Sequence, residues 1–402
     1  MTIKEIEQAA VRLRNVVHSI PVSSSHTFSR MSGAELYLKY ENQQKTGSFK
    51  VRGAYNKISK LMENPDHPTA VVASSAGNHA QGVAFAAAAS GLSATIVMPR
   101  SAPLAKVLAT ESYGAKVLLH GDCYDDAYNR AKEIEAETGA VFIHPFNDDD
   151  VMAGQGTIAL EVLRDLPNVD VVVIPAGGGG LLAGMAYGIK QINPRVKVVG
   201  VQSDGADAIV QSFKRKELVY IGDACTIADG IAVKCPGDLT VDIINRYVDD
   251  MVTVNEEEIA STILLLLERS KQVVEPAGAV SLAAAINGKL PDIAGKRVVC
   301  VLSGGNIDVS FIHRIVEKGL VNRGRQMKFK TIMLDVPGSL EHFSSILARS
   351  GANIIMVQHD RMQADLNLNE AILHIACEVS GPTHGQAVVA ALEAEGYKIH
   401  ME

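Results

Sequence analysis

Short apolar runs rich in β-branched residues alternate with stretches whose apolar residues recur at helical spacing along most of the chain. Runs that are apolar throughout predict strands buried on both faces, and the amphipathic stretches predict helices that cover them. The alternation predicts an α/β fold with parallel or mixed sheets, whose ligands bind beyond the carboxyl ends of the strands. The predicted strands are Glu35–Tyr40, Thr69–Ala73, Ala94–Met98, Ala115–Leu119, Val141–His144, Val169–Ile174, Val196–Val201 and Arg297–Leu302. The predicted helices are Val51–Leu61, Gly77–Ala89, Ala102–Tyr113, Asp122–Thr138 and Val151–Asp165.

The pattern changes after Gly324, where residues 325–330 are polar and basic and are interpreted as a linker. The remainder, residues 331–402, predicts the order βαββαβ of a ferredoxin-like plait. We therefore expect a domain at 1–324 and a second one at 331–402. The predicted elements of the plait are strands Thr331–Val336, Asn353–Asp360, Ala371–Val379 and Tyr397–Met401 and helices Leu340–Ser350 and Thr383–Glu395.

Length, charge and cysteine usage exclude several classes of protein. At 402 residues the chain is too long for one typical core, and its net charge of −7 argues against a nucleic-acid partner. Five scattered cysteines without a C-x-x-C pair indicate neither a zinc site nor disulfides, so we expect no metal and a cytoplasmic location. The charged N-terminus predicts an amphipathic helix instead of a signal peptide. The apolar run Val171–Ile189 contains Pro175 and four glycines, which favour a strand, a loop and a helix over a membrane span.

Lys50 ends the segment K-T-G-S-F-K, which begins at Lys45 and precedes a predicted helix. A lysine amine can form a Schiff base with an aldehyde cofactor, and the ring of Phe49 beside it can cover a cofactor ring. A solvated lysine at a helix start is the alternative for this segment alone. The cofactor interpretation is favoured because other motifs supply the remaining parts of a site for a phosphate-bearing cofactor.

Four consecutive glycines follow a predicted strand and open a helix. Their backbone N–H groups are free to converge on a phosphate at the helix N-terminus. Close packing of strand against helix is the alternative, although packing rarely needs more than two glycines. The residues of this loop are Gly177, Gly178, Gly179, Gly180 and Leu181.

The same loop permits a rival interpretation. Gly178, Gly180 and Ala183 match G-x-G-x-x-A, with Asp204 at the end of the next strand, which resembles a dinucleotide fingerprint. The acidic residue lies rather far along the chain, and a nicotinamide enzyme would leave Lys50 without a role.

The run A-S-S-A-G-N-H-A-Q-G, from Ala73 to Gly82, stands at another predicted strand-to-helix junction. Its Ser75, Asn78 and His79 offer a hydroxyl, an amide and an imidazole beside free helix N–H donors. We expect this loop to hold a substrate carboxylate while Asn78 reaches a ring hydroxyl. N-capping by Ser75 with Asn78 in a turn is the alternative.

The run V-L-S-G-G-N ends the last long predicted strand, and its Ser303 can hydrogen-bond a ring nitrogen or simply cap a helix. Glu275 in V-V-E-P-A-G-A and Asp229 in T-I-A-D-G-I are further candidates of lower rank, and either can be structural.

The four motifs, in this order, resemble the signature of fold type II pyridoxal-phosphate enzymes, and most closely the threonine ammonia-lyase (threonine dehydratase) family. The resemblance covers about residues 5–320. It implies two α/β lobes, the smaller at roughly 49–145, with pyridoxal 5'-phosphate between them. The implied cofactor contacts are Lys50 as the catalytic Schiff-base lysine, Phe49 against the ring, Asn78 on the ring hydroxyl, Gly177–Leu181 on the phosphate and Ser303 at the pyridine nitrogen. The implied substrate contacts are Ser75, Ala76, Asn78 and His79.

The resemblance also allows a comparison with serine racemase, a related enzyme of the same fold type. A neutral Ser303 does not keep the ring nitrogen protonated, which favours expulsion of a β-substituent. The racemase has a second serine where this chain has Ala76, so elimination should dominate over racemisation here. Gln202 and Ala208 stand where the racemase has acidic ligands for a divalent metal, which removes that expectation.

The implied reaction is β-elimination of water from L-threonine, and secondarily L-serine, with Lys50 removing the Cα proton. The plait resembles an ACT domain, which implies an amino-acid effector and a homo-oligomer, either a dimer or a tetramer; a packing role is the alternative. Three other functions stay open: a serine racemase or dehydratase, a β-replacing synthase of the same fold, and an inert amino-acid sensor.

Overall fold

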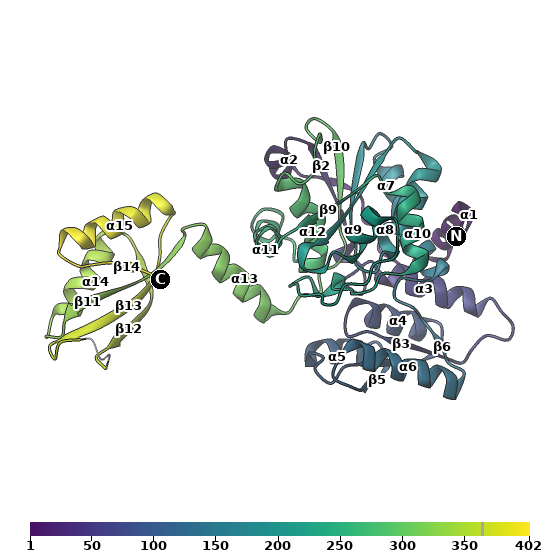
Figure 1. The fold of residues 1–402 in the computed structure, drawn as a ribbon, viewed down its shortest axis with the longest axis horizontal. Helices are drawn as coiled ribbons and strands as arrows, with labels where there is room; N and C mark the ends of the chain where they lie inside the picture. Colours follow the sequence, from purple (N-terminus) through teal and green to yellow (C-terminus); the bar gives the residue numbers. More distant parts are fainter. Residues whose placement is uncertain (363–365) are drawn as a thin grey trace. The chain divides into compact units, whose positions relative to one another are not determined.

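The computed structural model describes residues 1–362 and 366–402. The chain forms two compact units, Met1–Asp308 and Val309–Glu402 (Figure 1). This division falls earlier than the boundary at Gly324 that was expected from the sequence. Helix α13 (Val309–Asn322) belongs to the second unit, where its Glu317 accepts a 2.9 Å hydrogen bond from Lys328 of strand β11.

A six-stranded sheet forms the centre of the larger lobe of the first unit, in the order β1-β2-β10-β7-β8-β9. All neighbours are parallel except β1, which pairs antiparallel with β2. The strands are β1 (Ser23–Ser24), β2 (Glu35–Tyr40), β7 (Val171–Pro175), β8 (Lys197–Ser203), β9 (Asp250–Val254) and β10 (Arg297–Leu302). The helices of this lobe are α1 (Ile3–Arg12), α2 (His26–Ser32), α7 (Asp149–Asp165), α8 (Gly180–Ile192), α9 (Ala208–Arg215), α10 (Asp238–Tyr247), α11 (Glu256–Leu265) and α12 (Pro276–Ile286).

The smaller lobe is a four-stranded parallel sheet in the order β5-β4-β3-β6. The two sheets confirm the predicted two-lobed α/β fold. The smaller lobe lies below the larger one in Figure 1, with α3 and α4 between the sheets. Its strands are β3 (Ala70–Ser74), β4 (Ser93–Met98), β5 (Lys116–Leu119) and β6 (Val141–Phe142). Its helices are α3 (Lys50–Met62), α4 (Asn78–Ala89), α5 (Leu104–Glu111) and α6 (Tyr124–Thr138).

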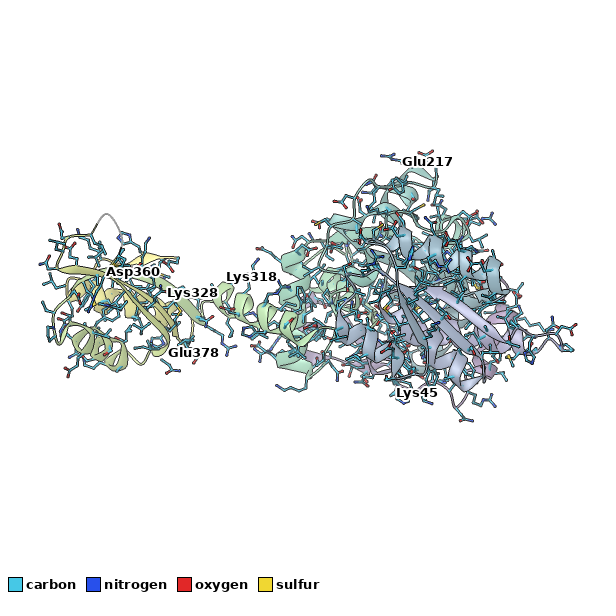
Figure 2. The ribbon with its side chains drawn as sticks, turned by 90° about the horizontal axis from the view of Figure 1, so that it is seen from below. Lys45, Glu217, Lys318, Lys328, Asp360 and Glu378 are labelled. Atoms are coloured by element: carbon cyan, nitrogen blue, oxygen red, sulfur yellow. The ribbon has the colours of Figure 1, made fainter. Side chains whose placement is uncertain are left out.

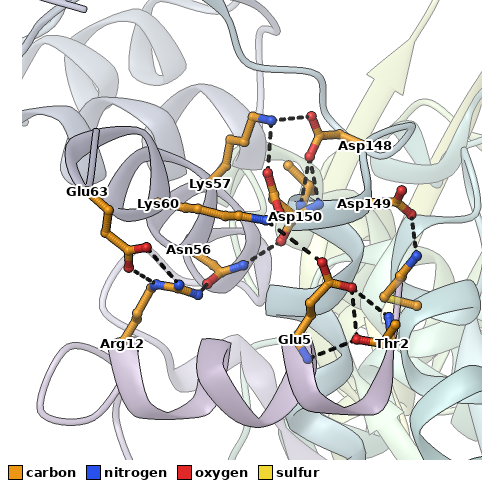
Figure 3. A network of polar contacts seen from close by, with 12 residues as sticks. Thr2, Glu5, Arg12, Asn56, Lys57, Lys60, Glu63, Asp148, Asp149 and Asp150 are labelled. Carbon is orange, nitrogen blue, oxygen red and sulfur yellow. Dashed lines mark hydrogen bonds and ion pairs between the residues drawn. The ribbon is translucent and has the colours of Figure 1, made fainter. Parts of the chain in front are cut away.

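Helix α3, whose first residue is Lys50, is tied to the start of α7 by a polar network (Figure 3). Asp150 in the first turn of α7 accepts from Lys57 at 3.1 Å and from Lys60 at 2.6 Å. Asn56 donates to the backbone carbonyl of Asp150 at 2.7 Å. The chain enters the smaller lobe through α3 and leaves it before α7, so these contacts join its two crossing points.

The second unit has the strand order β12-β13-β11-β14, antiparallel throughout, as a ferredoxin-like βαββαβ plait requires. The expected linker at 325–330 is a misreading, because strand β11 begins at Gln326 and pairs with β13 along its length. Met327 and Phe329 face the core while Lys328 and Lys330 point outward. The segment therefore alternates buried and exposed positions as a strand does, although its lysines made it look like a polar linker. The elements are β11 (Gln326–Leu334), α14 (Ser339–Arg349), β12 (Asn353–Asp360), β13 (Glu370–Glu378), α15 (Pro382–Ala394) and β14 (His400–Met401).

Among the described residues, no helix combines the length and apolar character needed to span a membrane.

Candidate active site

The segment that carries Lys50 lies beside the segment that follows β10. Ser48 and Gly304 form an isolated antiparallel bridge. The backbone N–H of Phe49 donates to the carbonyl of Ser303 at 3.1 Å, and that of Gly305 donates to Gly47 at 2.9 Å. Two motifs distant in sequence therefore meet at the carboxyl edge of the large sheet, where the topology predicts a ligand site.

The Lys50 amine is set up as a nucleophile. Burial lowers its pKa to about 8, although the negative charge of Glu275 opposes the shift. Its Nζ donates to the carbonyl of Pro145 at 3.0 Å and lies 5.3 Å from the centre of the Phe49 ring. A pKa near 8 leaves an appreciable neutral fraction at physiological pH, and the neutral amine is the form that attacks an aldehyde.

The glycine loop joins β7 to α8, and all four glycines are required by space. A Cβ on Gly178 would lie 2.2 Å from the Phe146 ring, and one on Gly180 would lie 2.9 Å from Phe146 Cα. Gly177 faces Ile231 Cα at 2.9 Å, and Gly179 has φ +98°. Packing rarely needs more than two glycines, but here close contacts or backbone conformation require all four, so their number does not by itself favour a phosphate. The phosphate interpretation depends instead on the start of α8, where no side chain of the described residues caps the first N–H groups.

Replacing Gly178 with alanine is expected to weaken phosphate-dependent cofactor binding at least tenfold, because the new methyl group collides with Phe146 beside the open N–H groups. The measurement is the dissociation constant of pyridoxal phosphate for the apo-protein, by fluorescence titration. Gly222→Ala is the matched control, since nothing lies within 4 Å of a Cβ at that position. Equal affinities for the two variants would contradict the assignment of the loop.

Asn78 begins helix α4, after the carboxyl end of β3, and both atoms of its amide are engaged. Its Nδ2 donates to Glu275 Oε1 at 2.7 Å, and its Oδ1 accepts from Asn306 Nδ2 at 2.7 Å. Burial, reinforced by the charge of Asp229, raises the pKa of Glu275 to about 8. The structure thus places Glu275, which the sequence indicated less strongly than the other motifs, in direct contact with Asn78. Its place immediately before Pro276 at the start of α12 is the only sequence signal for it.

The other two polar candidates of the loop after β3, Ser75 and His79, differ in how well they suit a carboxylate. Ser75 Oγ accepts from the backbone N–H of Gly77 at 3.2 Å, and the hydrogen of its hydroxyl remains available to a ligand. The alternative, N-capping by Ser75 with Asn78 in a turn, is wrong, because Gly77 is the N-cap residue of α4 and Asn78 begins the helix. His79 is buried and its Nε2 donates to the carbonyl of Ile143 at 2.8 Å. Burial and then the charge of Lys50 lower the pKa of His79 to about 3. Its imidazole is therefore neutral, with an acceptor at Nδ1. Contrary to the expectation from sequence, His79 does not attract a carboxylate.

Buried polar atoms without partners lie in the segment that leads to Lys50 and at the junction of β3 and α4. In the described part of the chain, the hydroxyls of Thr46, Ser48 and Ser74 and Nδ1 of His79 are buried and make no hydrogen bond. Ser303, also buried, has one long contact, with Oγ 3.4 Å from the carbonyl of Ala277. An unsatisfied buried polar atom costs about 1–3 kcal/mol. A polar ligand would remove this cost, so these residues, with Lys50 and the uncapped helix, fit pyridoxal phosphate.

Acidic, histidine and cysteine side chains do not gather around a metal position. No group of three or more of them within residues 1–362 and 366–402 is placed to hold an ion. At the position compared with the racemase, Gln202 Oε1 accepts from the backbone N–H of Val210 at 2.9 Å. The Nε2 of Gln202 is buried without a partner among the described residues, and an N–H donor does not bind a cation.

Comparison with known proteins agrees with this site. A family model described as "Pyridoxal-phosphate dependent enzyme" matches residues 13–304. The chain belongs to this family of pyridoxal-phosphate-dependent enzymes. The cofactor of this family is pyridoxal phosphate, so the dinucleotide interpretation of the glycine loop is wrong.

Individual relatives and solved structures give a more specific comparison than the family model. The L-threonine ammonia-lyase of Thermotoga maritima is 50% identical over 401 residues, which cover 100% of this chain and 99% of the relative. The structure of the processed form of threonine deaminase isoform 2 from Solanum lycopersicum matches with TM-score 0.73 and 36% identity, covering 78% of this chain and 88% of its own. The structure of maize serine racemase matches with TM-score 0.74 and 35% identity, covering 80% of this chain and 98% of its own.

Proposed function

We propose that this enzyme deaminates L-threonine to 2-oxobutanoate and ammonia, and secondarily L-serine to pyruvate and ammonia. The observation that carries the proposal is the placement of a lysine of lowered pKa against the segment that bears Ser303. The sequence is 50% identical to an L-threonine ammonia-lyase over 401 residues, including the second unit, and this similarity supports the choice of substrate. Maize serine racemase, which shares the fold, supports racemisation as the second candidate.

Pyridoxal phosphate, when bound, withdraws electrons from the substrate and acidifies its Cα–H bond. Lys50 in its neutral form accepts the Cα proton, and its low pKa keeps enough of the amine neutral for this task. The β-hydroxyl leaves as water, and the released unsaturated amine takes up water and loses ammonia, which balances the reaction.

The other residues of the site would bind the cofactor and orient the substrate. When pyridoxal phosphate is bound, the N–H groups of Gly177–Leu181 would hold its phosphate, Asn78 would donate to its ring oxygen, and Phe49 would cover the ring. The neutral hydroxyl of Ser303 would pair with the ring nitrogen without keeping it protonated, which would favour loss of the β-substituent. Ser75 and the first N–H groups of α4 orient the substrate carboxylate. Ala76 offers no proton to the opposite face of Cα.

The test is keto-acid release from L-threonine by purified enzyme without any added nucleophile. Equal amounts of 2-oxobutanoate and ammonia are expected, with slower release of pyruvate from serine. A requirement for a second, nucleophilic substrate would instead indicate a β-replacing synthase. Serine racemisation that matches or exceeds serine deamination would contradict the argument from Ala76, and Ala76→Ser should raise racemisation. Absence of turnover with bound cofactor would point to an inert sensor.

We further propose that the second unit is an ACT-like regulatory domain that binds an amino-acid effector, and that the enzyme acts as a cytoplasmic homo-oligomer, a dimer or tetramer. Such an enzyme would serve isoleucine biosynthesis or threonine catabolism. Support comes from the antiparallel βαββαβ plait and from the whole-length match to a threonine ammonia-lyase. The measurement is activity against added amino acids for the intact chain and for a chain that ends at Gly324. Identical responses would remove the regulatory role.

A further inference from the structure

The side chain of Asn306 connects three segments of the site. Its Nδ2 donates to the backbone carbonyl of Thr46 at 2.8 Å and to Oδ1 of Asn78 at 2.7 Å. Asn306 follows β10, Thr46 lies in the segment that leads to Lys50, and Asn78 begins α4. One amide nitrogen therefore joins the lysine segment to the residue proposed to contact the cofactor.

The hydrogen bonds determine which way each amide is turned. A backbone carbonyl only accepts, so the atom of Asn306 that faces Thr46 must be the NH₂ group. The second hydrogen of that group requires an acceptor, so Asn78 must present Oδ1 to it. The Nδ2 of Asn78 is then directed to Glu275 Oε1 at 2.7 Å, and a carboxyl oxygen accepts there. The chain of contacts is consistent from the fixed carbonyl of Thr46 to Glu275.

This orientation has a consequence for the cofactor. The Nδ2 of Asn78 carries two hydrogens, and the contact with Glu275 uses one of them. We propose that Asn306 is a positioning residue that holds Asn78 so that an N–H, and not a carbonyl oxygen, faces the ring oxygen of pyridoxal phosphate. The inference rests on the proposed contact of Asn78 with that oxygen. A donor at this position stabilises the ring oxygen as an anion, whereas a reversed amide would repel it.

Two glycines leave the space for these contacts. A Cβ on Gly47 would lie 2.3 Å from Oδ1 of Asn306, and a Cβ on Gly304 would lie 2.1 Å from Oε1 of Glu275. Any side chain at either position would displace one member of the chain of hydrogen bonds. This gives the glycines of the two motifs a role beyond turn formation.

The experiment compares Asn306→Ala, Asn78→Ala and the double variant with the unchanged enzyme. Two quantities are measured: the dissociation constant of pyridoxal phosphate, and the pH at which the visible absorption of the loaded enzyme titrates. Asn306→Ala should weaken binding about tenfold and shift that pH in the same direction as Asn78→Ala, because a charge-assisted hydrogen bond is lost or reversed. The double variant should be no worse than Asn78→Ala alone.

Controls separate this role from a structural one. Asn42 is a nearby asparagine whose Nδ2 donates to the carbonyl of Val273 at 3.0 Å, and Asn42→Ala should change neither quantity. If Asn306→Ala does not fold, Asn306→Asp keeps the size without the donor and should shift both quantities in the same direction.

Additive effects in the double variant would overturn the inference, since Asn306 would then act through the lysine segment and not through Asn78. No effect of Asn78→Ala would overturn both the inference and the proposed contact of Asn78. Continued keto-acid release from threonine in that case would show that the proposed reaction itself still stands.

Discussion

Replacing Lys50 with alanine is expected to lower 2-oxobutanoate release by roughly 10³-fold or more, because the variant lacks both the covalent attachment and the base for the Cα proton. The same variant should lose the borohydride-stable adduct with pyridoxal phosphate. Rates are measured with saturating threonine and cofactor, and the adduct is located by mass spectrometry of peptides. Exogenous amines should restore part of the rate if the lost function is proton transfer.

Lys45 provides the matched control for this experiment. It lies in the same segment, is exposed at the surface of the first unit (Figure 2), and its Nζ is 5.7 Å from the Phe85 ring centre. Lys45→Ala should retain both turnover and the adduct at position 50. An adduct on any other lysine in the unchanged enzyme would refute the assignment of Lys50 and the mechanism that depends on it.

Much of the fold was predictable because its strands are uniformly apolar and bounded by polar turns. Glu35–Tyr40 and Arg297–Leu302 have the bounds predicted for them. The motifs follow such strands, so parallel topology alone placed Lys50, Asn78 and Ser303 toward the same edges of the sheets. Helix α12 was not predicted, because it is buried almost all round and therefore lacks amphipathic spacing. Strand β9 is short and partly exposed, and its pattern is equally weak.

The electrostatic character of the site was not predictable from residue types. The low pKa of His79 and the raised pKa of Glu275 both follow from burial, which depends on tertiary contacts. Asn306 is the last residue of the motif V-L-S-G-G-N, yet its role depends on contacts with Thr46 and Asn78, which are far away in sequence. Sequence spacing identifies such residues as neighbours of a site but does not indicate which way their amides turn.

A group of buried charged residues that includes Arg52 of α3 was also not predicted, since charge ordinarily predicts exposure. The guanidinium of Arg52 donates to Glu41 through two contacts of 2.8 Å and to Glu161 at 2.6 and 3.0 Å. Lys39 donates to Glu161 at 2.5 Å. The side chains of Arg52, Lys39 and Glu41 are 0% exposed, so two cations and two carboxylates balance inside the first unit. Arg52 lies two residues after Lys50, in the first turn of α3.

Arg52→Met is therefore expected to lower the free energy of unfolding of the first unit by about 3–5 kcal/mol, because it removes the cation that contacts both Glu41 and Glu161, while Lys39 contacts only Glu161 in this network. The measurement is urea denaturation of the apo-protein, followed by fluorescence. Arg246→Met is the control, since Arg246 is 66% exposed and paired with Asp242 on the surface of α10. Adding Glu41→Leu to Arg52→Met should recover part of the loss by removing one unpaired charge. Equal effects of the two arginine variants would mean that the buried network adds nothing to the placement of α3, and the geometry of Lys50 would then need another explanation.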